Sequence, residues 1–279
     1  MDLSIIIVSW RVKELLFDCL KSLYQYIDGL AFEVIVIDND SGDGTVEMIK
    51  ENFPQVKLIA SQINLGFAKA NNLGLRYAVG RYLLFLNPDT KFLDNALLKC
   101  VRKMAGDQEI GVLGCKLLNR DLSVQPSVRR FPGLTDHLLM IFKLHHLFPL
   151  KRYFALDFDY NYSQLVDQVM GAFFMVNRRA LIKTGAWDAN YYLLFEEVDL
   201  CRRMIDCGYK VFYFSGAAVV HYGGQSFNRE IFNLKKQWIF SQSRLRYVLK
   251  HQGFYAYLLI LLLTPVSLLL SIIPPKHVR

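Results

Sequence analysis

The chain has 279 residues, and its composition of 53% hydrophobic and 21% charged residues excludes an intrinsically disordered protein. Lys and Arg total 33 against 25 Asp and Glu, and this net charge of +8 leaves nucleic acid, anionic lipid and phosphorylated ligands open as partners. The five cysteines show no CxxC spacing, which argues against a zinc knuckle or a disulfide framework and for a reducing, cytosolic compartment.

The first 116 residues alternate between two patterns. Continuous apolar runs predict strands buried on both faces, and apolar residues at helical spacing predict helices between them. Such alternation indicates a parallel α/β sheet. The expected strands are residues 3–10, 32–40, 56–60, 81–89 and 110–115. The expected helices cover residues 16–27, 46–53, 67–78 and 97–104.

The alternation breaks between residues 119 and 165. Within this part, residues 138–153 mix apolar and basic side chains, a composition typical of a helix on a membrane surface or of a partly covered surface helix. We expect regular structure again at residues 168–176, 197–205 and 209–221.

The C-terminal segment differs from the rest of the chain. Residues 254–273 contain no charged side chain, and a helix of about 20 residues spans about 30 Å, the thickness of one hydrocarbon core. The preceding stretch is rich in Lys and Arg, so the positive-inside rule places it on the cytoplasmic side. A buried core helix or a re-entrant hairpin is the alternative. The short apolar run at residues 3–8 does not fit a signal peptide, so we expect the N-terminal part in the cytosol.

Polar side chains follow three of the expected strands. The first strand ends in Ser9, the second in Asp38, and the fourth in Asn87 and Asp89. Ligands of an open parallel sheet bind at the carboxyl ends of its strands, so these groups predict a site at one edge. The alternative is that Asp and Asn stand there as ordinary turn formers.

Several other site types are disfavoured. The sequence has no GxGxxG, GxxxxGK[ST] or HExxH motif, and the segment that starts at Asp38 departs from the EF-hand pattern. Basic residues gather near the C-terminal apolar segment rather than along one recognition helix, which argues against a nucleic-acid partner.

Two further groups are candidates for chemistry. Glu196, Glu197 and Asp199 lie close together; adjacent carboxylates raise one another's pKa, and a half-buried one can serve as a general base. The alternative is an acidic first turn of a helix, favoured by the helix dipole. His221 follows an apolar strand, a position that by itself favours a structural histidine.

Eight stretches occur in an order that we recognise. They are SIIIVSW, VIVIDNDSGDGT, NLGFAKANNLGL, GRYLLFLNPDT, RRFP, GAFFMVNRRAL, GAWDANYYLLFEEVDLCRR and GYKVFYFSGAAVVHYGGQS. Together they cover about residues 3–226, and with them the chain resembles family 2 glycosyltransferases, in particular the bacterial rhamnosyltransferase-type branch that builds surface polysaccharides. The resemblance implies the α/β GT-A fold, in which helices flank a mostly parallel central sheet. It also implies a nucleoside-diphosphate sugar donor, a divalent cation (Mg²⁺ or Mn²⁺) and inversion at the anomeric carbon.

The resemblance assigns roles to individual residues. Asp38 matches the acid that binds the base or ribose, and Asn87-Pro88-Asp89 matches the metal motif usually written DxD, with an amide in its first position. Asp89 is then the main carboxylate on the metal, and His221 joins it there. The second residue of the Glu196-Glu197 pair matches the catalytic base. The other implied donor-side residues are Ser9, Asn64, Gly66, Asn71, Arg129 and Arg130. The implied acceptor-side residues are Gly171, Ala172, Trp187 and Asp188.

The sequence therefore predicts a membrane-associated inverting glycosyltransferase. We expect a catalytic domain over residues 1–228, a basic juxtamembrane helical region over 229–253 and a hydrophobic membrane-associated segment over 254–279. The expected donor is a nucleoside-diphosphate sugar, with rhamnose favoured, and the expected acceptor is a glycan or lipid-linked glycan at the cytoplasmic face of the plasma membrane. The alternatives are a non-catalytic nucleotide-sugar-binding protein and a membrane scaffold on a degenerate transferase fold.

Overall fold

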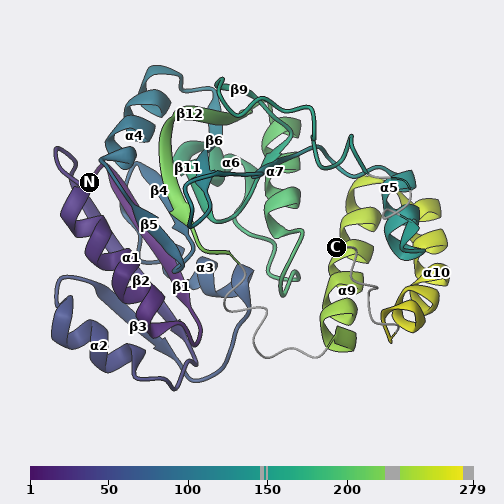
Figure 1. The fold of residues 1–279 in the computed structure, drawn as a ribbon, viewed down its shortest axis with the longest axis horizontal. Helices are drawn as coiled ribbons and strands as arrows, with labels where there is room; N and C mark the ends of the chain where they lie inside the picture. Colours follow the sequence, from purple (N-terminus) through teal and green to yellow (C-terminus); the bar gives the residue numbers. More distant parts are fainter. Residues whose placement is uncertain (145–147, 149, 224–232, 273–279) are drawn as a thin grey trace.

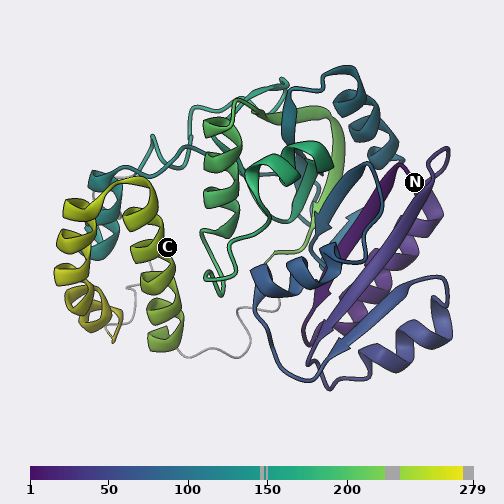
Figure 2. The ribbon, with the colours of Figure 1, turned by 180° about the vertical axis from the view of Figure 1, so that it is seen from behind.

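A computed structural model describes residues 1–144, 148, 150–223 and 233–272. A mixed sheet with helices on both faces forms most of the molecule, and a group of three helices lies beside it (Figure 1). The two faces of the sheet carry different helices, as the view from behind shows (Figure 2).

The first half of the chain forms the alternating elements that the sequence predicts. Its strands are β1 (Leu3–Ser9), β2 (Phe32–Asn39), β3 (Lys57–Ser61), β4 (Tyr82–Leu86), β5 (Thr90–Phe92) and β6 (Ile110–Leu118). Its helices are α1 (Lys13–Tyr26), α2 (Thr45–Asn52), α3 (Phe67–Leu75) and α4 (Ala96–Gly106). The strand expected at residues 81–89 is shorter in the structure: β4 ends at Leu86, residues 87–89 are outside any strand, and β5 begins after them at Thr90.

The second half mixes short and long elements. Its strands are β7 (Val124–Gln125), β8 (Val128–Arg129), β9 (Gln164–Leu165), β10 (Gln168–Val169), β11 (Phe173–Asn177) and β12 (Lys210–His221). Its helices are α5 (Leu134–Ile141), α6 (Arg178–Thr184), α7 (Glu196–Asp206), α9 (Asn233–His251) and α10 (Phe254–Ile272).

The sheet is mostly parallel, as predicted. Its strand order is β3-β2-β1-β4-β11-β6-β12-β5. β1 pairs in parallel with β2 and β4, and β6 pairs in parallel with β12, whereas β11 and β5 run antiparallel to their neighbours. Because β1, β2 and β4 are parallel neighbours, their carboxyl ends meet at one edge, where the polar residues follow.

The core explains why the strands are continuously apolar. Side chains alternate between the two faces of a strand, and both faces of this sheet are covered by helices. Ile5 and Ile7 pack in the cluster that includes residues of α1 and α4, whereas Ile6 packs in the opposite cluster with residues of α3, α6 and α7. The five cysteines are free, so no disulfide supplements this core.

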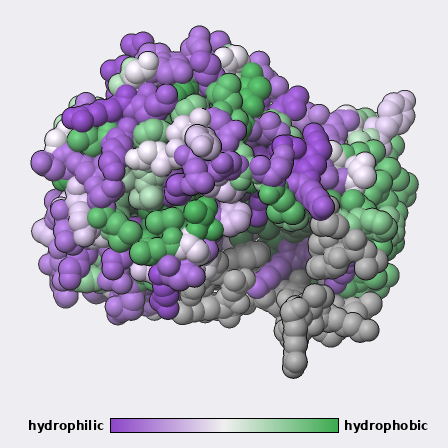
Figure 3. All heavy atoms as spheres, turned by 45° about the horizontal axis from the view of Figure 1, so that its top comes forward, coloured by the Kyte–Doolittle hydropathy of each residue, from purple (hydrophilic) through white to green (hydrophobic). Residues whose placement is uncertain are grey.

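The group of three helices consists of α5, α9 and α10. Gly253, at a φ of +92°, makes the turn between α9 and α10. The small core of the group contains Ile141, Leu245, Val248 and Ile260, one or more from each helix. Apolar side chains gather on the outside of this end of the molecule (Figure 3).

Two expected elements differ in the structure. The helix expected at residues 138–153 is replaced by α5, which ends at Ile141, and by turns at residues 151–157; residues 145–147 and 149 lie outside the described residues. The strand expected at residues 168–176 is divided into β10 and β11, because residues 170–172 leave the strand and contact the site edge instead. Residues 224–232, which contain the expected boundary at 228, also lie outside the described residues.

Candidate active site

The carboxyl edge of β1 and β2 carries buried polar atoms without a partner. Asp38 is 5% exposed, and one carboxylate oxygen accepts a hydrogen bond from the Ser41 amide at 3.5 Å. Its other oxygen and the buried Ser9 hydroxyl have no hydrogen-bond partner among the described residues. Burial raises the pKa of Asp38 above its ordinary value. Buried polar atoms are rarely left unpaired, so these two atoms are available to a polar ligand.

The loop between β3 and α3 lies next to this edge and is held by asparagines. The Asn39 amide nitrogen donates to Asn64 Oδ1 at 3.0 Å, and the Tyr192 hydroxyl donates to the same oxygen at 3.2 Å. Gly66 has a φ of +76°, and a Cβ there would lie 2.6 Å from the Tyr192 carbonyl oxygen, so a larger residue would push the two segments apart. Asn71 uses its amide within α3, where it donates to the Phe67 carbonyl.

A cavity of about 700 Å³ opens beside the same edge. Arg11 follows β1 and lines this cavity. Its backbone amide donates to the Ser41 hydroxyl oxygen, and the Ser41 hydroxyl donates to the Ser9 carbonyl. The sequence analysis did not single out the cationic side chains at this cavity, because no motif marks them. The cavity is lined by Arg11, Lys13, Asp43, Arg120 and Tyr222, among others.

Asp89 and His221 meet where β4 ends and β12 ends. Asp89 Oδ1 lies 3.3 Å from His221 Nε2. The side chain of His221 is 6% exposed and that of Asp89 is 8% exposed. His221 Nδ1 lies 2.7 Å from Gln125 Oε1. The Gln125 amide nitrogen donates to the His221 carbonyl and to Asn119, so Oε1 must accept the proton of Nδ1. In the neutral imidazole, Nε2 then carries the lone pair, and this lone pair faces Asp89.

The Asp89–His221 pair fits a divalent cation that takes its other ligands from a substrate. A carboxylate oxygen and an imidazole lone pair face each other, and the Asn87 amide lies 3.4 Å from the same Nε2. Within the described part of the chain, no group of three or more His, Cys, Asp or Glu side chains is arranged to hold a metal ion. Two protein ligands are sufficient for Mg²⁺ or Mn²⁺ when phosphate oxygens supply others.

The two glutamates stand at the start of α7 after a strained turn. Leu194 and Phe195 have φ values of +72° and +69°, a conformation that costs free energy in residues other than glycine. Glu196 is 5% exposed and its Oε2 has no partner, while Glu197 is half-buried. Burial raises the pKa of both carboxyls, and the charge of Glu197 adds to the increase at Glu196.

Two of the predicted acceptor-side residues connect the two halves of the site. The Asn87 amide donates to the Ala172 carbonyl at 3.0 Å, and a Cβ at Gly171 would lie 4.0 Å from the Glu197 Cβ. Residues 171–172 therefore lie next to both the Asn87–Asp89 segment and Glu197.

The basic loop contributes one arginine, not two, to this region. The charge of Arg129 acts on Glu197 and lowers its pKa, against the larger effect of burial. The Arg129 guanidinium lies over the rings of Tyr153 and Phe154, at 5.8 and 5.2 Å. Arg130 instead makes an exposed ion pair with Asp157 at 2.8 Å.

The structure gives Trp187 and Asp188 contacts within the protein. Trp187 is 3% exposed and packs edge-on against Phe67 and Phe85 in the core, and its buried Nε1 has no hydrogen-bond partner among the described residues. Asp188 accepts hydrogen bonds from Nε and Nη2 of Arg246 and lies 3.2 Å from Lys250, both on α9. The Asp188 carboxylate is therefore engaged by α9, whereas the Trp187 ring still has an unpaired donor.

Asp199 also binds α9, a role that the sequence did not reveal. It is fully buried, and Arg203, Lys250 and His251 surround its carboxylate at 2.7–2.8 Å. Part of the basic juxtamembrane region expected at residues 229–253 therefore forms ion pairs within the protein. Lys250 pairs with the two acids and Arg246 with Asp188, because α9 packs on the α7 side of the domain.

The sequence and the fold were compared with those of known proteins. The profile of Glycosyl transferase family 2 matches residues 4–184. The chain is 25% identical over 222 residues to the N-acetylglucosaminyl-diphospho-decaprenol L-rhamnosyltransferase of Mycobacterium tuberculosis. The aligned region covers 71% of this chain and 68% of that protein. It is 25% identical over 231 residues to Rhamnosyltransferase WbbL of Escherichia coli K12, with 79% and 84% covered.

Solved structures with the same fold are glycosyltransferases. The mannosyltransferase PcManGT from Pyrobaculum calidifontis, in complex with GDP-Man and Mn²⁺, superposes with a TM-score of 0.61 at 16% identity over 97% of this chain and 72% of that one. GalNAc-T7 with UDP, GalNAc and Mn²⁺ gives a TM-score of 0.62 at 14% identity over 88% and 48%. These likenesses confirm the predicted GT-A fold.

Proposed function

Because this chain belongs to glycosyl transferase family 2 and is a glycosyltransferase, we propose that it transfers a sugar, rhamnose first among the candidates, from a nucleoside-diphosphate sugar to a lipid-linked glycan. One observation carries the proposal. Residues 171–172 contact both Asn87, which begins the segment that carries Asp89, and Glu197, and this proximity supports a site where the donor and the acceptor meet.

The donor fits the edge at β1, β2 and β4. Asp38 and Ser9 offer unpartnered polar atoms for the base or ribose, and the cavity beside them has cationic side chains for the diphosphate. Asp89 and His221 would hold a divalent cation, which when bound acts as a Lewis acid on the departing diphosphate. Neighbours of the same fold bind GDP-Man or UDP with Mn²⁺, and this supports a nucleotide donor and a divalent cation.

Glu197 is the general base of the proposed reaction. It is half-buried, whereas Glu196 is enclosed, so Glu197 is the carboxylate that an acceptor can reach. Glu197 takes the proton of the acceptor hydroxyl while that oxygen bonds to the anomeric carbon and the bond to the diphosphate oxygen breaks. Attack from the face opposite the leaving group inverts the anomeric configuration. Glu196 and the strained turn before it position Glu197.

The outer surface of α10 supports a membrane location. The inward face of this helix carries Thr264 and Ser267, which are buried and hydrogen-bonded, beside the buried Ile260, while several leucines lie outside. A helix in water keeps most of its leucines on the side that faces the core. Residues 254–271 are apolar and long enough to cross a bilayer, and 17% of that window is buried. We place the enzyme at the cytoplasmic face of the plasma membrane.

The proposal is tested by a transfer assay with purified full-length protein. A panel of nucleoside-diphosphate sugars, Mn²⁺ or Mg²⁺, and a diphosphate-linked lipid acceptor would be offered, and the product linkage read by NMR. Glu197→Gln should lower kcat by at least 10²-fold, because the base is lost, and leave donor affinity unchanged. Glu51→Gln, on the exposed surface of α2, is the matched control.

Two results would contradict the proposal. Donor binding without turnover in the wild-type protein would favour the non-catalytic binding protein. No metal-dependent binding of any nucleotide, with Asp89→Ala indistinguishable from wild type, would favour the membrane scaffold.

A further inference from the structure

Arg244 of α9 is fully buried without a partner. It is the largest of the fully buried side chains in the described residues, and none of its Nε, Nη1 and Nη2 atoms has a hydrogen bond there. Burial lowers its pKa to about 10, so the guanidinium is still charged at neutral pH. Its contact with Phe240, 5.5 Å from guanidinium to ring, replaces only part of the lost hydration. A buried charge of this kind calls for a counter-ion.

Two more unpartnered donors accompany Arg244. His137 of α5 is fully buried and is connected to Arg244 through two rings: His137 contacts Phe195, Phe195 contacts Phe240, and the charged guanidinium of Arg244 lies over Phe240. Burial and that charge lower the pKa of His137 to about 3, so the ring is neutral. Ser241, one helical turn before Arg244, has a buried hydroxyl without a partner.

The hydrogen-bond network assigns the proton of His137. The Gln252 amide nitrogen donates to the Pro132 carbonyl at 2.7 Å and lies 3.2 Å from His137 Nε2, which must therefore accept. The proton of the neutral ring is then on Nδ1, which has no partner. Guanidinium, imidazole and hydroxyl thus all offer hydrogen-bond donors. The unpartnered acceptor in the group is Gln252 Oε1.

The acids beside α9 do not supply the missing charge. Asp188 is engaged by Arg246 and Lys250, and Asp199 by Arg203, Lys250 and His251. None of the nitrogen atoms of the Arg244 guanidinium has a hydrogen bond to an acid among the described residues. A fork of guanidinium donors with two neutral donors suits an anion with several oxygens, such as a phosphate or diphosphate.

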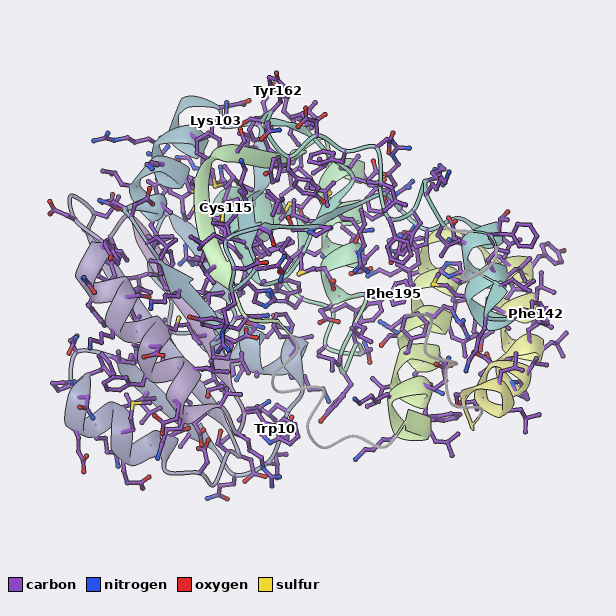
Figure 4. The ribbon with its side chains drawn as sticks, viewed as in Figure 1. Trp10, Lys103, Cys115, Phe142, Tyr162 and Phe195 are labelled. Atoms are coloured by element: carbon purple, nitrogen blue, oxygen red, sulfur yellow. The ribbon has the colours of Figure 1, made fainter. Side chains whose placement is uncertain are left out.

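The position of these donors between the catalytic domain and the apolar helices indicates what carries that anion. Phe195, which directly precedes Glu196, lies where the α/β domain faces α9 (Figure 4). Its ring centroid is 6.1 Å from that of His137 and 5.5 Å from that of Phe240. On the other side, Ile141 and Val248 belong to the small core that α5 and α9 share with α10. An anion here has carboxylates on one side and an apolar surface on the other.

We propose that Arg244, His137 and Ser241 form a binding site for the diphosphate of a lipid-linked acceptor. The acceptor's sugar then extends past Phe195 towards Glu196 and Glu197, and its hydrocarbon chain follows α5 and α10 into the membrane. Phe240 is partly exposed, so the diphosphate reaches the guanidinium past this ring. The inference rests on the proposed function, because it specifies how the acceptor of that reaction is held.

Binding is measured on the full-length protein in neutral detergent with farnesyl diphosphate as the probe, by calorimetry. Farnesol and inorganic diphosphate are the two partial probes. Arg244→Met keeps the apolar length and removes the charge, and Lys235→Met removes a charge from an exposed position of the same helix. We expect Arg244→Met to weaken farnesyl diphosphate binding at least tenfold, Arg244→Lys to weaken it less, and Lys235→Met to leave it unchanged.

The stability of the empty protein gives a second readout. Removing an uncompensated buried charge should raise the melting temperature in Arg244→Met. A lower melting temperature together with unchanged farnesyl diphosphate binding would show that Arg244 is structural and overturn the site. Equal binding of farnesol would overturn the diphosphate, and equally tight binding of inorganic diphosphate through Arg244 would overturn the lipid source in favour of a free diphosphate.

The transfer assay separates this inference from the proposed function. Suppose that the wild-type protein transfers no sugar but binds farnesyl diphosphate, and that Arg244→Met abolishes this binding. The site is then supported and the proposed function is contradicted. If it transfers sugar and Arg244→Met leaves the KM for the lipid acceptor unchanged, the function stands and the site fails. If the site and the proposed function are both correct, Arg244→Met raises the KM for the acceptor at least tenfold and changes the KM for the donor little.

Discussion

At the scale of single residues, the site combines strained and unpartnered groups. Leu194 and Phe195 hold left-handed backbone immediately before one buried and one half-buried carboxyl, and Asp38 and Ser9 hold polar atoms without a partner. Each of these features costs folding free energy, and such costs gather where a protein binds or reacts. These features support the proposed site independently of the relatives.

The raised pKa of Glu197 has a consequence for the rate. A general base acts only when it is deprotonated, so kcat/KM should rise with pH through the pKa of Glu197. Because burial raises this pKa, the acidic limb should lie above about 4.3, the ordinary value of a glutamate. In Arg129→Met, which removes a charge that lowers the pKa, the limb should move to higher pH. A pH profile with saturating metal measures both; an unchanged limb in Arg129→Met would contradict the assignment.

Gln125 is a positioning residue for His221. Its Oε1 accepts from Nδ1 at 2.7 Å and so keeps the lone pair of Nε2 towards Asp89. Partners of this kind are worth about 10–100-fold in metal affinity. We expect Gln125→Leu to weaken Mn²⁺ binding by about that factor, and Gln125→Glu, which retains an acceptor, to weaken it less. Titration of Mn²⁺ by EPR, with nucleoside diphosphate present and no acceptor, measures this; equal affinities would remove the role.

At the scale of elements, the packing of α9 on α7 is electrostatic as well as apolar. Asp199 is fully buried under Arg203, Lys250 and His251, and it lies two residues after Glu197 on the same helix. Aromatic contacts of Phe195 with Phe240 and Tyr247 complete the junction. The helix that carries the proposed base is therefore held in place by the helix that leads to α10.

Removing this acid should destabilise the whole domain. Asp199→Ala removes the buried carboxylate that Arg203, Lys250 and His251 bind, and loss of one member of a buried pair costs roughly 3–5 kcal/mol. Asp206→Ala, which breaks an exposed pair with Arg202 on the same helix, is the control and should cost less than about 1 kcal/mol. Chemical denaturation in detergent measures both, and similar losses for the two variants would refute the difference.

The same acid gives a pH dependence of stability. Burial alone would raise the pKa of Asp199, but His251, Arg203 and Lys250 outweigh it and hold the pKa below its ordinary value. A lowered folded-state pKa contributes stability above the unfolded value of about 3.9, and that contribution is lost as pH falls through the folded-state pKa. Wild type should therefore lose stability in acid more steeply than Asp199→Ala.

At the scale of the whole molecule, an α/β domain is joined to an apolar helical group. The group presents exposed leucines on α10, and these form the apolar end of the molecule (Figure 3). Because α9 packs on α7, the way in which α10 contacts a membrane would set the orientation of the α/β domain towards that membrane. The proposed site would then open towards the source of a lipid-linked acceptor.

The apolar face of α10 is testable directly. Replacing Leu258, Leu261 and Leu262 by Ser should weaken liposome binding at least tenfold, because each buried leucine contributes roughly 1.5–3 kcal/mol. The control replaces three exposed apolar residues of the α/β domain by Ser: Val79, Leu165 and Ile182. Co-sedimentation with liposomes measures the effect. If both triple variants still bind liposomes as wild type does, α10 is not the membrane contact.

The sequence by itself determined the sheet and the edge at which its polar residues lie. Apolar runs that recur with helical segments between them have few solutions other than a parallel α/β sheet, and the polar residues that end those runs must then share an edge. Asp38, Asn87 and Asp89 could be identified for that reason. The motif order added the family, which the comparisons confirm.

Only the tertiary structure decided which side chains meet across the chain. Gln125 reaches His221, Asp188 and Asp199 reach α9, and Gln252 reaches His137, all over separations of about 50 residues or more. No local spacing encodes such pairs, because they depend on how helices pack after the sheet has formed. For the same reason Trp187, which the motif assigned to the acceptor, lies in the core. Packing decides between contact and burial, and it acts on the folded chain as a whole.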